Sequence, residues 1–364
     1  MPNSDRLNAL NEGEPPGGLT FWEATKWRPL YHILEERGYR LRGRYKPGWC
    51  DQFHHVLDAT RISDGQQVIL KMLSPSSPEL SANILLLSEP ARSDSRNHCL
   101  LVLDVFCIGT KEVEIDFVVF PLYRSWFDPP HVHLVAEIIP FMNQLLEGLC
   151  FLHDLNIAHG DIKALNVLMD PSPMYPHGFN PLVTGRPDRR YSLAHDPAPV
   201  RTRLTTKIHY VYNDFGACTV FESIEARKLV QYKRRGTFDA PECTIGELYD
   251  PFAYDVWLLG KLFLDLGLYD MIPAMETLIF AMYASEPTSR LKAQQCLDIL
   301  RTAVPKMAWG LLARIPNPIV TIYHTPDSWS RYFMGPTRNE DAREYLRRMV
   351  ELLVMNDGVP CIQS

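Results

Sequence analysis

The residues best suited to chemistry lie in two short segments of the chain. The first, His159–Asn166, places an acid, Asp161, five residues before an amide, Asn166, with Lys163 between them. The second segment is Asp214 followed by Phe-Gly. Phosphoryl transfer from a metal-bound nucleotide needs this set: a carboxylate for the attacking hydroxyl, an amide oxygen and a second carboxylate for Mg²⁺, and a cation for the phosphate. Because the transition state spreads its charge, positioned charges would supply most of the catalysis.

Each of these side chains has an expected role. Asp161 would accept or orient the proton of the attacking hydroxyl, and Lys163 could reach the γ-phosphate. Asn166 and Asp214 would hold Mg²⁺ through oxygen atoms, the ligands that this ion prefers. A lone His-Gly-Asp is commonly a turn and a lone Asp-Phe-Gly is a weak signal, so the order of the two segments and the full spacing of the first favour the chemical interpretation. His159 is expected to pack and to bond the backbone.

A second cation lies earlier in the chain. Lys71 follows Val-Ile-Leu in an apolar run, where an unpaired ammonium is costly to bury, and in a nucleotide site its partners would be the α- and β-phosphates. Glu79, at an expected helix start, could pair with Lys71. The alternatives are a strand-end lysine that faces solvent and a glutamate favoured by the helix dipole.

Bulk properties limit the class of protein. The chain has 364 residues, a hydrophobic content of 46% that supports a core, and a net charge of −6 without a long block of either sign. This charge argues against nucleic-acid and membrane-surface partners. The eight cysteines have no zinc-ligand spacing, the N-terminus has no apolar signal-peptide region, and no apolar run approaches membrane-spanning length. A cytoplasmic or nuclear protein is therefore expected.

The order of the expected elements divides the chain. Residues 1–20 are expected to be disordered, residues 21–39 to contain a helix that ends at Gly38, and the next part to form strands. The strands are expected at 53–62, 66–73, 100–106 and 115–120, the first two joined by an Asp64-Gly65 turn, and a long helix at 134–153. A Pro- and Arg-rich insertion covers 171–206, and a last helix begins at Thr337. Strands first and helices later indicate an α+β protein.

Three further segments make the chain resemble the eukaryotic protein kinases over roughly residues 40–300. Ala240-Pro241-Glu242 is similar to the end of the family's activation segment. Asp255–Gly260 is similar to the next helix, whose aspartate anchors the catalytic loop, and Arg290 matches the arginine that pairs with the glutamate. The segments Asp94–Leu100 and Asp170–Pro176, with the insertion, further resemble kinase-like proteins expanded in mushroom-forming fungi.

The resemblance implies a bilobal protein-kinase-like fold, with a β-rich lobe at 40–122, a helical lobe at 123–320 and a helical extension at 321–364. It implies ATP and Mg²⁺ as cofactors and a protein substrate with a Ser or Thr acceptor, because Lys163 is typical of Ser/Thr kinases. Phe120 would be the gatekeeper and Pro121, Leu122 and Tyr123 the hinge. The implied nucleotide-binding residues are Lys71, Glu79, Val56, Ile69, Phe120, Leu122 and Leu168.

Several positions depart from the family pattern. The stretch 49–56, where the glycine-rich phosphate loop is expected, has no glycine, and Gly43 and Gly48 lie too early. Ile69 stands where a small residue would lie above adenine, and Asn83 where an apolar residue is expected. The interval between Lys71 and Glu79 is short for an ion pair. Gly160 replaces the arginine that binds a phosphate on the activation segment, so phosphorylation of that segment is not expected to switch the protein on.

Three other interpretations stay open at this point. A pseudokinase scaffold fits the missing glycine loop but not the retained Asp161 and Asp214. A small-molecule kinase of the aminoglycoside or choline type shares His-Gly-Asp but lacks the segments at 240–242 and 255–260. A soluble α+β domain with coincidental motifs requires five ordered matches to arise by chance. A weak protein kinase is the favoured interpretation.

Overall fold

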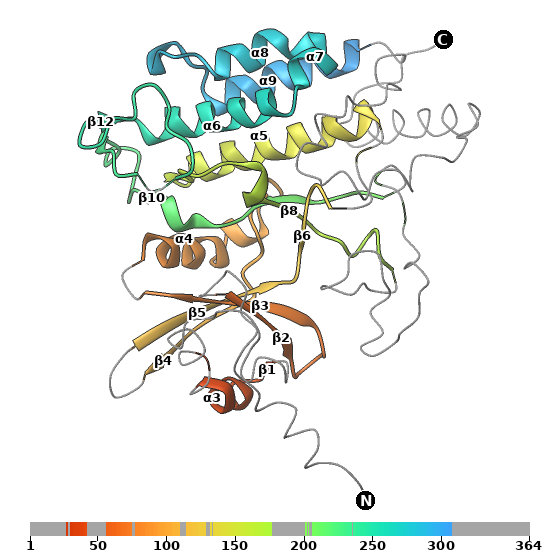
Figure 1. Cartoon of the computed structure of the whole chain (residues 1–364), viewed down its shortest axis with the longest axis vertical. Coiled ribbons are helices and arrows are strands. Elements are labelled where there is room, and N and C mark those ends of the chain that lie inside the picture. Colours follow the sequence, from red (N-terminus) through yellow and green to blue (C-terminus); the bar gives the residue numbers. More distant parts are fainter. Residues whose placement is uncertain are drawn as a thin grey trace, which may run out of the picture. The chain divides into compact units, whose positions relative to one another are not determined.

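The computed structural model describes residues 27, 30–41, 56–74, 77–109, 114–128, 132, 134–176, 201, 203, 206–234 and 236–307. The expectations for 1–20, for most of 171–206, for the helix at Thr337 and for the 321–364 extension lie outside these residues. The chain divides into two compact units. Unit 1 contains Met1–Ser93 and Leu100–Leu122, and unit 2 contains Asp94–Cys99 and Tyr123–Ser364. The secondary structure is mixed α+β, as the sequence predicts (Figure 1).

Unit 1 contains an antiparallel five-stranded sheet. Its strands, in spatial order, are β1 (Tyr39–Leu41), β2 (Val56–Arg61), β3 (Gln67–Leu73), β5 (Glu114–Pro121) and β4 (Asp104–Gly109). The expected hairpin joins β2 to β3. Its turn is closed by an ion pair between Arg61 and Asp64 at 2.5 Å and by Gly65, whose φ of +74° suits a residue without a side chain.

One strand boundary differs from the sequence prediction. The strand expected at 100–106 begins only at Asp104 and continues to Gly109. Leu100 and Val102 are buried, but they precede the run of residues that pairs with β5. The apolar residues at 100–103 predicted a strand because they are buried. Burial alone does not make a strand, however, and the limits of β4 are set by the residues that pair with β5.

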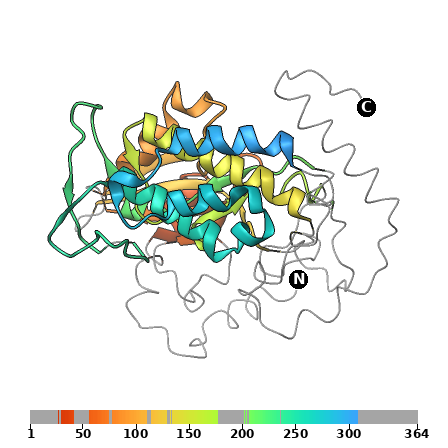
Figure 2. The same cartoon turned by 90° about the horizontal axis from the view of Figure 1, so that it is seen from above.

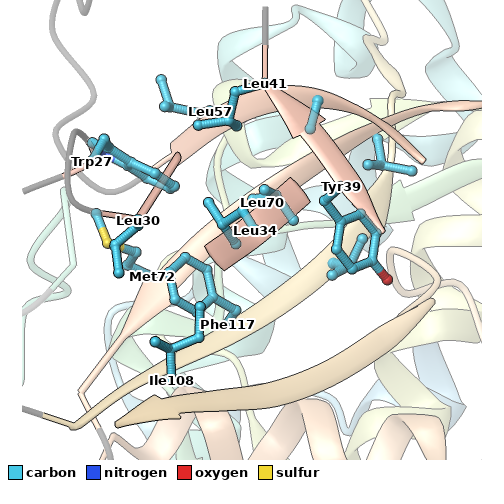
Figure 3. Close-up of a cluster of buried hydrophobic side chains, with 13 residues drawn as sticks. Trp27, Leu30, Leu34, Tyr39, Leu41, Leu57, Leu70, Met72, Ile108 and Phe117 are labelled. Atoms are coloured by element: carbon cyan, nitrogen blue, oxygen red, sulfur yellow. The ribbon is translucent and has the colours of Figure 1, made fainter. Parts of the chain in front are cut away.

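A helix covers one face of this sheet. The expected N-terminal helix appears as α3 (Tyr31–Glu36), and Gly38, with a φ of +94°, follows its end. Leu34, which is 0% exposed, packs with Trp27 and Leu30 against alternate residues of the sheet, as Figure 3 shows. The sheet residues of this cluster are Tyr39, Leu41, Leu57, Ala59, Val68, Leu70, Met72, Ile108, Phe117 and Val119. Residues at odd positions of β3, including Lys71, therefore face the other way.

Unit 2 is mainly helical. Its helices are α5 (Ile138–Asp154), α6 (Pro251–Asp265), α7 (Leu268–Met271), α8 (Glu276–Met282) and α9 (Ala293–Ala303), and α5 corresponds to the expected helix at 134–153. Figures 1 and 2 show α9 alongside α5 and α8 alongside α6. Gly260 permits the close approach of α6 to α8, because a Cβ at this position would lie 2.7 Å from the Met282 Cβ.

One buried helix has the composition of a membrane span. Val135–Asp154 is, within the described ranges, the one helical segment long and apolar enough to cross a membrane. This contradicts the expectation that no run approaches that length. However, 78% of its apolar window is buried inside the protein, as in the core helix of a globular domain.

The long insertion leaves and rejoins unit 2 at one place. β8 (Val167–Met169) and β9 (Tyr210–Tyr212) pair antiparallel on its two sides, and β6 (Arg124–Ser125) extends this sheet. The backbone N–H of Arg201 donates to the carbonyl oxygen of Met174 at 2.9 Å. The two ends of the insertion are thus hydrogen-bonded to each other, next to the paired strands β8 and β9.

Replacing Leu34 with Ala is expected to lower the free energy of unfolding by about 2–5 kcal/mol, because it opens a cavity between α3 and the sheet. Urea denaturation would measure the change. His32→Ala, at an exposed position of the same helix, is the control and should change stability by less than about 0.5 kcal/mol. Equal effects of the two substitutions would contradict the packing of α3 on the sheet.

Replacing residues 177–200 with a short Gly-Ser linker is expected to change the free energy of unfolding by less than about 1 kcal/mol, because loop-closure entropy varies slowly with length. The matched variant is Arg203→Met in the full chain. It should destabilise clearly, because the buried Arg203 guanidinium donates to the Trp126 carbonyl and the Tyr210 hydroxyl. Thermal unfolding would compare the two, and a larger loss from the linker would show that the insertion is part of the fold.

Candidate active site

A buried carboxylate on α6 holds the loop that carries Asp161. Asp255 is 0% exposed, and its two oxygens accept the backbone N–H groups of His159 at 2.7 Å and Gly160 at 2.8 Å. His153, at the end of α5, contacts the same carboxylate through Nε2 at 3.2 Å. The expected anchoring of the loop by Asp255 is confirmed. These contacts also satisfy two N–H groups that no regular element pairs.

His159 is structural, as expected. It is 0% exposed, and its Nε2 lies 3.1 Å from the carbonyl oxygen of Asn213. Its Nδ1 accepts the backbone N–H of Asp161 at 3.2 Å, and its ring packs against Phe215. Both ring nitrogens are therefore engaged with the backbone on each side of the candidate site.

Three donors converge on the Asp161 carboxylate. Lys163 Nζ lies 2.5 Å and Asn166 Nδ2 2.9 Å from Asp161 Oδ2, and the backbone N–H of Thr237 donates to Oδ1 at 2.7 Å. The Thr237 hydroxyl also accepts from Lys163 Nζ at 2.6 Å. The structure thus brings together the predicted acid, cation and amide. It adds Thr237, to which the sequence pattern assigned no role. The sequence does not reveal this contact, because it forms only when a segment far along the chain folds back to Asp161.

The two candidate metal ligands come from adjoining backbone segments. The backbone N–H of Asn213 donates to the carbonyl oxygen of Asn166 at 2.9 Å, which brings Asp214 beside Asn166. Because Asn166 Nδ2 donates to both the carbonyl and the carboxylate of Asp161, its side-chain oxygen remains as the group that could coordinate a cation. Asp214 has φ 64° and ψ 80°, a left-handed conformation that is costly for a residue with a side chain and that is typical of functional sites.

This pair fits Mg²⁺ bound together with a nucleotide. The residues that the structure describes contain no group of three or more His, Cys, Asp or Glu side chains able to hold a metal ion. An amide oxygen with one carboxylate is a smaller set, and Mg²⁺ commonly takes one or two protein carboxylates and completes its shell with phosphates and water. Asn166 and Asp214 therefore suit a metal that arrives with ATP.

Unit 1 contains the second predicted cation in an ion pair. Lys71 Nζ lies 2.5 Å from Glu79 Oε1, and the two side chains are 17% and 5% exposed. Glu79 belongs to α4 (Pro78–Leu87), which begins with Pro78 after Ser77, whose hydroxyl accepts the Glu79 N–H. The pairing of Glu79 with Lys71, which the sequence raised as a possibility, is thus present, and the short interval between the two residues does not prevent it.

The sheet register gathers other predicted nucleotide-binding residues around Lys71. Val56 lies opposite Lys71 across β2 and β3, and Ile69 lies opposite Phe120 across β3 and β5. Residues directly opposite in an antiparallel pair share a face, as do alternate residues of one strand. Val56, Ile69, Lys71 and Phe120 therefore lie on the face opposite the α3 cluster. Their role in nucleotide binding stays a prediction.

The remaining predicted residues have separate positions. Leu122 follows β5, and its N–H donates to the Gln67 carbonyl at 3.4 Å, whereas Leu168 is a half-buried residue of β8 in unit 2. The division between the units falls between Leu122 and Tyr123. Burial raises the pKa of Tyr123, so its hydroxyl stays neutral.

The expected phosphate loop falls mostly outside the described residues. β1 ends at Leu41 and β2 begins at Val56, and residues 42–55, which include Gly43 and Gly48, lie outside the described part of the chain. The placement of the loop at 49–56 therefore stays a prediction.

The other departure in unit 1 is a buried amide. Asn83 is 1% exposed, and its Nδ2 donates back to the carbonyl oxygen of Glu79 at 2.9 Å. Its side-chain oxygen has no hydrogen-bond partner among the described residues. Asn83 thus bonds within α4, one turn after the glutamate that holds Lys71, at the cost of an unsatisfied acceptor.

Gly160 occupies a position that no side chain fits. Its φ is +78°, and a Cβ built on it would lie 2.4 Å from the carbonyl oxygen of Ala217. A Cβ on Gly236 would in turn lie 2.5 Å from the Gly160 carbonyl oxygen. The two glycines let three backbone segments meet beside Asp161. The packing around Gly160 thus leaves no room for an arginine side chain at this position, which agrees with the departure from the family pattern.

The expected ion pair behind this site is present. Arg290 Nη1 and Nη2 lie 2.5 and 2.7 Å from the two carboxylate oxygens of Glu242, and the Arg290 side chain is almost fully buried. Such a two-pronged contact fixes orientation as well as distance. The resemblance predicted this pair from residues 48 positions apart.

Comparison with known proteins gives a distant match. The chain is 29% identical over 132 residues to a Saccharomyces cerevisiae protein described as "Probable serine/threonine-protein kinase KKQ8", in each of two strains. The matched part covers 35% of this chain and 13% of the yeast protein, so the chain corresponds to a small part of that relative. No protein-family profile matches the chain. The mixed α+β fold and this match together support a kinase-like relationship at a coarse level.

Gly160→Ala is expected to destabilise unit 2 and to displace the loop of Asp161, because the new methyl group meets the Ala217 backbone. Gly65→Ala is the matched control: its φ is +74°, but nothing lies within 4 Å of the added Cβ. Both substitutions carry a left-handed backbone penalty of about 1–2 kcal/mol, and the additional loss in Gly160→Ala measures the contact. Thermal unfolding would compare them, and equal losses would contradict the close approach.

Proposed function

We propose that this protein transfers the γ-phosphoryl group of ATP, with Mg²⁺, to a serine or threonine hydroxyl of a protein substrate. The observation that carries the proposal is the group around Asp161, where one carboxylate accepts from an ammonium, an amide and a backbone N–H. Structural carboxylates also form such groups, but in unit 2 this one lies beside Asn166 and Asp214, and unit 1 holds a Lys71–Glu79 pair, which together are the residue types that phosphoryl transfer requires. The yeast match supports the reaction class.

Counted over the described residues, the donors around Asp161 leave one acceptor position for a substrate. An ionised carboxylate offers about four lone-pair positions, of which Lys163, Asn166 and Thr237 occupy three. The remaining position, on Oδ1, would accept the hydroxyl hydrogen bond of the substrate. As the hydroxyl oxygen bonds to the γ-phosphorus, its proton passes to Asp161, and the bond from phosphorus to the β,γ-bridging oxygen breaks to release ADP.

Lys163 is placed to act on the same reaction centre. Its ammonium is held by Asp161 Oδ2 and by the Thr237 hydroxyl, so it is oriented before any substrate binds. A γ-phosphate that approached the Asp161-bound hydroxyl would meet this cation, which would offset the charge of the transferred group. The Ser/Thr preference follows from the family resemblance.

The cofactor would be held by the other predicted residues. Bound Mg²⁺ neutralises phosphate charge and draws electrons from the transferred group. Asn166 and Asp214 would coordinate it, and Lys71, oriented by Glu79, would bind the α- and β-phosphates. Val56, Ile69, Phe120, Leu122 and Leu168 would contact the nucleotide base and sugar.

A scaffold that binds nucleotide without turnover is the alternative. It is favoured by Ile69, a branched side chain on the same sheet face as Lys71, where it would narrow the adenine pocket. A small-molecule kinase is disfavoured by the Glu242–Arg290 pair and by the Asp255 anchor, which sequence analysis associated with protein kinases. A transfer assay therefore decides between the first two.

Other parts of the proposal rest on sequence alone. The narrower similarity to kinase-like proteins of mushroom-forming fungi depends on segments 94–100 and 170–176. A cytoplasmic or nuclear location, and the lack of nucleic-acid and membrane partners, follow from composition. The bilobal arrangement follows from the family resemblance. Each stays a prediction.

Asp161→Asn and Asp214→Asn are each expected to lower the rate of phosphoryl transfer by a factor of about 100 or more, through loss of the base and of a metal ligand respectively. The measurement is transfer from labelled ATP to a generic protein substrate by the purified full chain. Asp265→Asn is the control, because among the described residues Asp265 forms its ion pair with Lys261, one turn earlier on α6, and its replacement should leave the rate unchanged.

Thermal unfolding with ATP, with and without Mg²⁺, separates the outcomes. Turnover together with an Mg²⁺-dependent stabilisation that Asp214→Asn removes would support the proposal. Stabilisation by nucleotide without turnover would favour the scaffold, and equal rates for wild type and Asp161→Asn would exclude Asp161 from the reaction. Transfer to an aminoalcohol or aminoglycoside, but to no protein, would instead identify a small-molecule kinase.

A further inference from the structure

One arginine fastens the segment between Asp214-Phe-Gly and Ala-Pro-Glu to the rest of unit 2. Arg227 Nε donates to Asn156 Oδ1 at 2.8 Å, and its Nη2 donates to the carbonyl oxygen of His153. Its guanidinium carbon lies 4.3 Å from the centre of the Phe252 ring. One half-buried side chain thus contacts the end of α5, the turn that follows it and the first turn of α6. The planar, multidentate guanidinium suits this combination better than a lysine would.

The acceptors of Arg227 are an amide oxygen and a carbonyl oxygen at the C-terminal end of α5. His153 lies in the last turn of α5, where the helix dipole presents negative charge, and its carbonyl oxygen accepts the N–H of Asn156 at 3.0 Å as well as the guanidinium of Arg227. Asn156 has a φ of 60°, so its backbone turns sharply and presents the side chain toward the segment. The site of contact is therefore formed by α5 and its C-terminal turn, independently of any modification.

Backbone pairing supports the same contact. In β10 (Thr219–Val220), the segment pairs with β7 (Ile157–Ala158), and the N–H of Phe221 donates to the Asn156 carbonyl at 3.0 Å. Arg227 closes this stretch at its far end. The segment from 219 to 227 thus lies along the chain that leads from α5 into the loop of Asp161.

The contact is connected to Asp161 through two hydrogen-bonded residues. His153, whose carbonyl accepts from Arg227, also contacts Asp255, and Asp255 holds the N–H groups of His159 and Gly160. Farther along, the segment reaches Asp161 directly through the N–H of Thr237. Displacing Arg227 would therefore free the segment whose later part fixes the Asp161 carboxylate.

The cation lies on the opposite side of the contact from where a phosphate-dependent switch has it. In such a switch, a cation beside the catalytic acid binds a phosphate on the segment. Here the residue beside Asp161 is Gly160, whose surroundings exclude a side chain, and the cation belongs to the segment itself. Its partners are neutral acceptors and an aromatic ring, which are present in the unmodified protein.

We propose that Arg227 is a positioning residue that orders the 217–239 segment in the unphosphorylated protein and thereby fixes Thr237 against Asp161. The effect on segment order stands by itself, whereas the effect on turnover rests on the proposed kinase activity. The test therefore uses two measurements that can fail separately.

The variants are Arg227→Met, which keeps much of the bulk of the side chain and removes its charge, and Arg227→Lys, which keeps the charge but lacks the several N–H donors of the planar guanidinium. Lys228→Met, at the exposed neighbouring position, is the control. All are studied as full chains after phosphatase treatment. Hydrogen exchange of the backbone amides of 217–237 reports segment order, and kcat and KM for a protein substrate report turnover. Thermal unfolding confirms that each variant is folded.

Arg227→Met is expected to speed amide exchange in the segment about tenfold or more, as the loss of hydrogen bonds from a charged donor implies. It should lower kcat by a similar factor with little change in KM for ATP, and Arg227→Lys should recover part of both. Wild-type kcat should not change on phosphatase treatment. Unchanged exchange in Arg227→Met, or a wild type that gains activity severalfold when phosphorylated within 217–239, would overturn the proposal. A wild type without turnover would refute the kinase function alone, and exchange would then decide the role of Arg227.

Discussion

The hydrogen bonds of one buried carboxylate determine where the candidate chemistry lies. An ionised side chain without exposure is costly unless several donors surround it, and Asp255 receives two backbone N–H groups and a contact from His153. Those N–H groups belong to His159 and Gly160, which no helix or strand ladder pairs. The carboxylate thus gains the donors that it needs, and the N–H groups of the loop gain acceptors. The position of Asp161 depends on α6, which lies far away in the sequence, and α6 is held in turn by the packing of Gly260 against α8.

The sequence carried enough information for those parts of the site that depend on residue type and spacing. Three features need particular side chains and are therefore visible in the sequence. They are the Asp161–Asn166 spacing, the Asp255 anchor and the Glu242–Arg290 pair. Thr237 contributes mainly a backbone N–H, which any residue but proline possesses, and its role depends on tertiary approach. The start of β4 was missed for a related reason, because strand limits follow the pairing partner.

Both predicted lysines are paired with carboxylates before any ligand binds. Lys71 contacts Glu79 in unit 1, and Lys163 contacts Asp161 in unit 2, each at 2.5 Å. An ammonium free in water would have to lose its hydration and its rotational freedom when it met a phosphate. Here much of the desolvation occurs during folding, and the carboxylate holds the ammonium in one orientation. A phosphate that reached either lysine would therefore meet a cation that needs little reorganisation, which is the condition under which fixed charges lower a barrier most effectively.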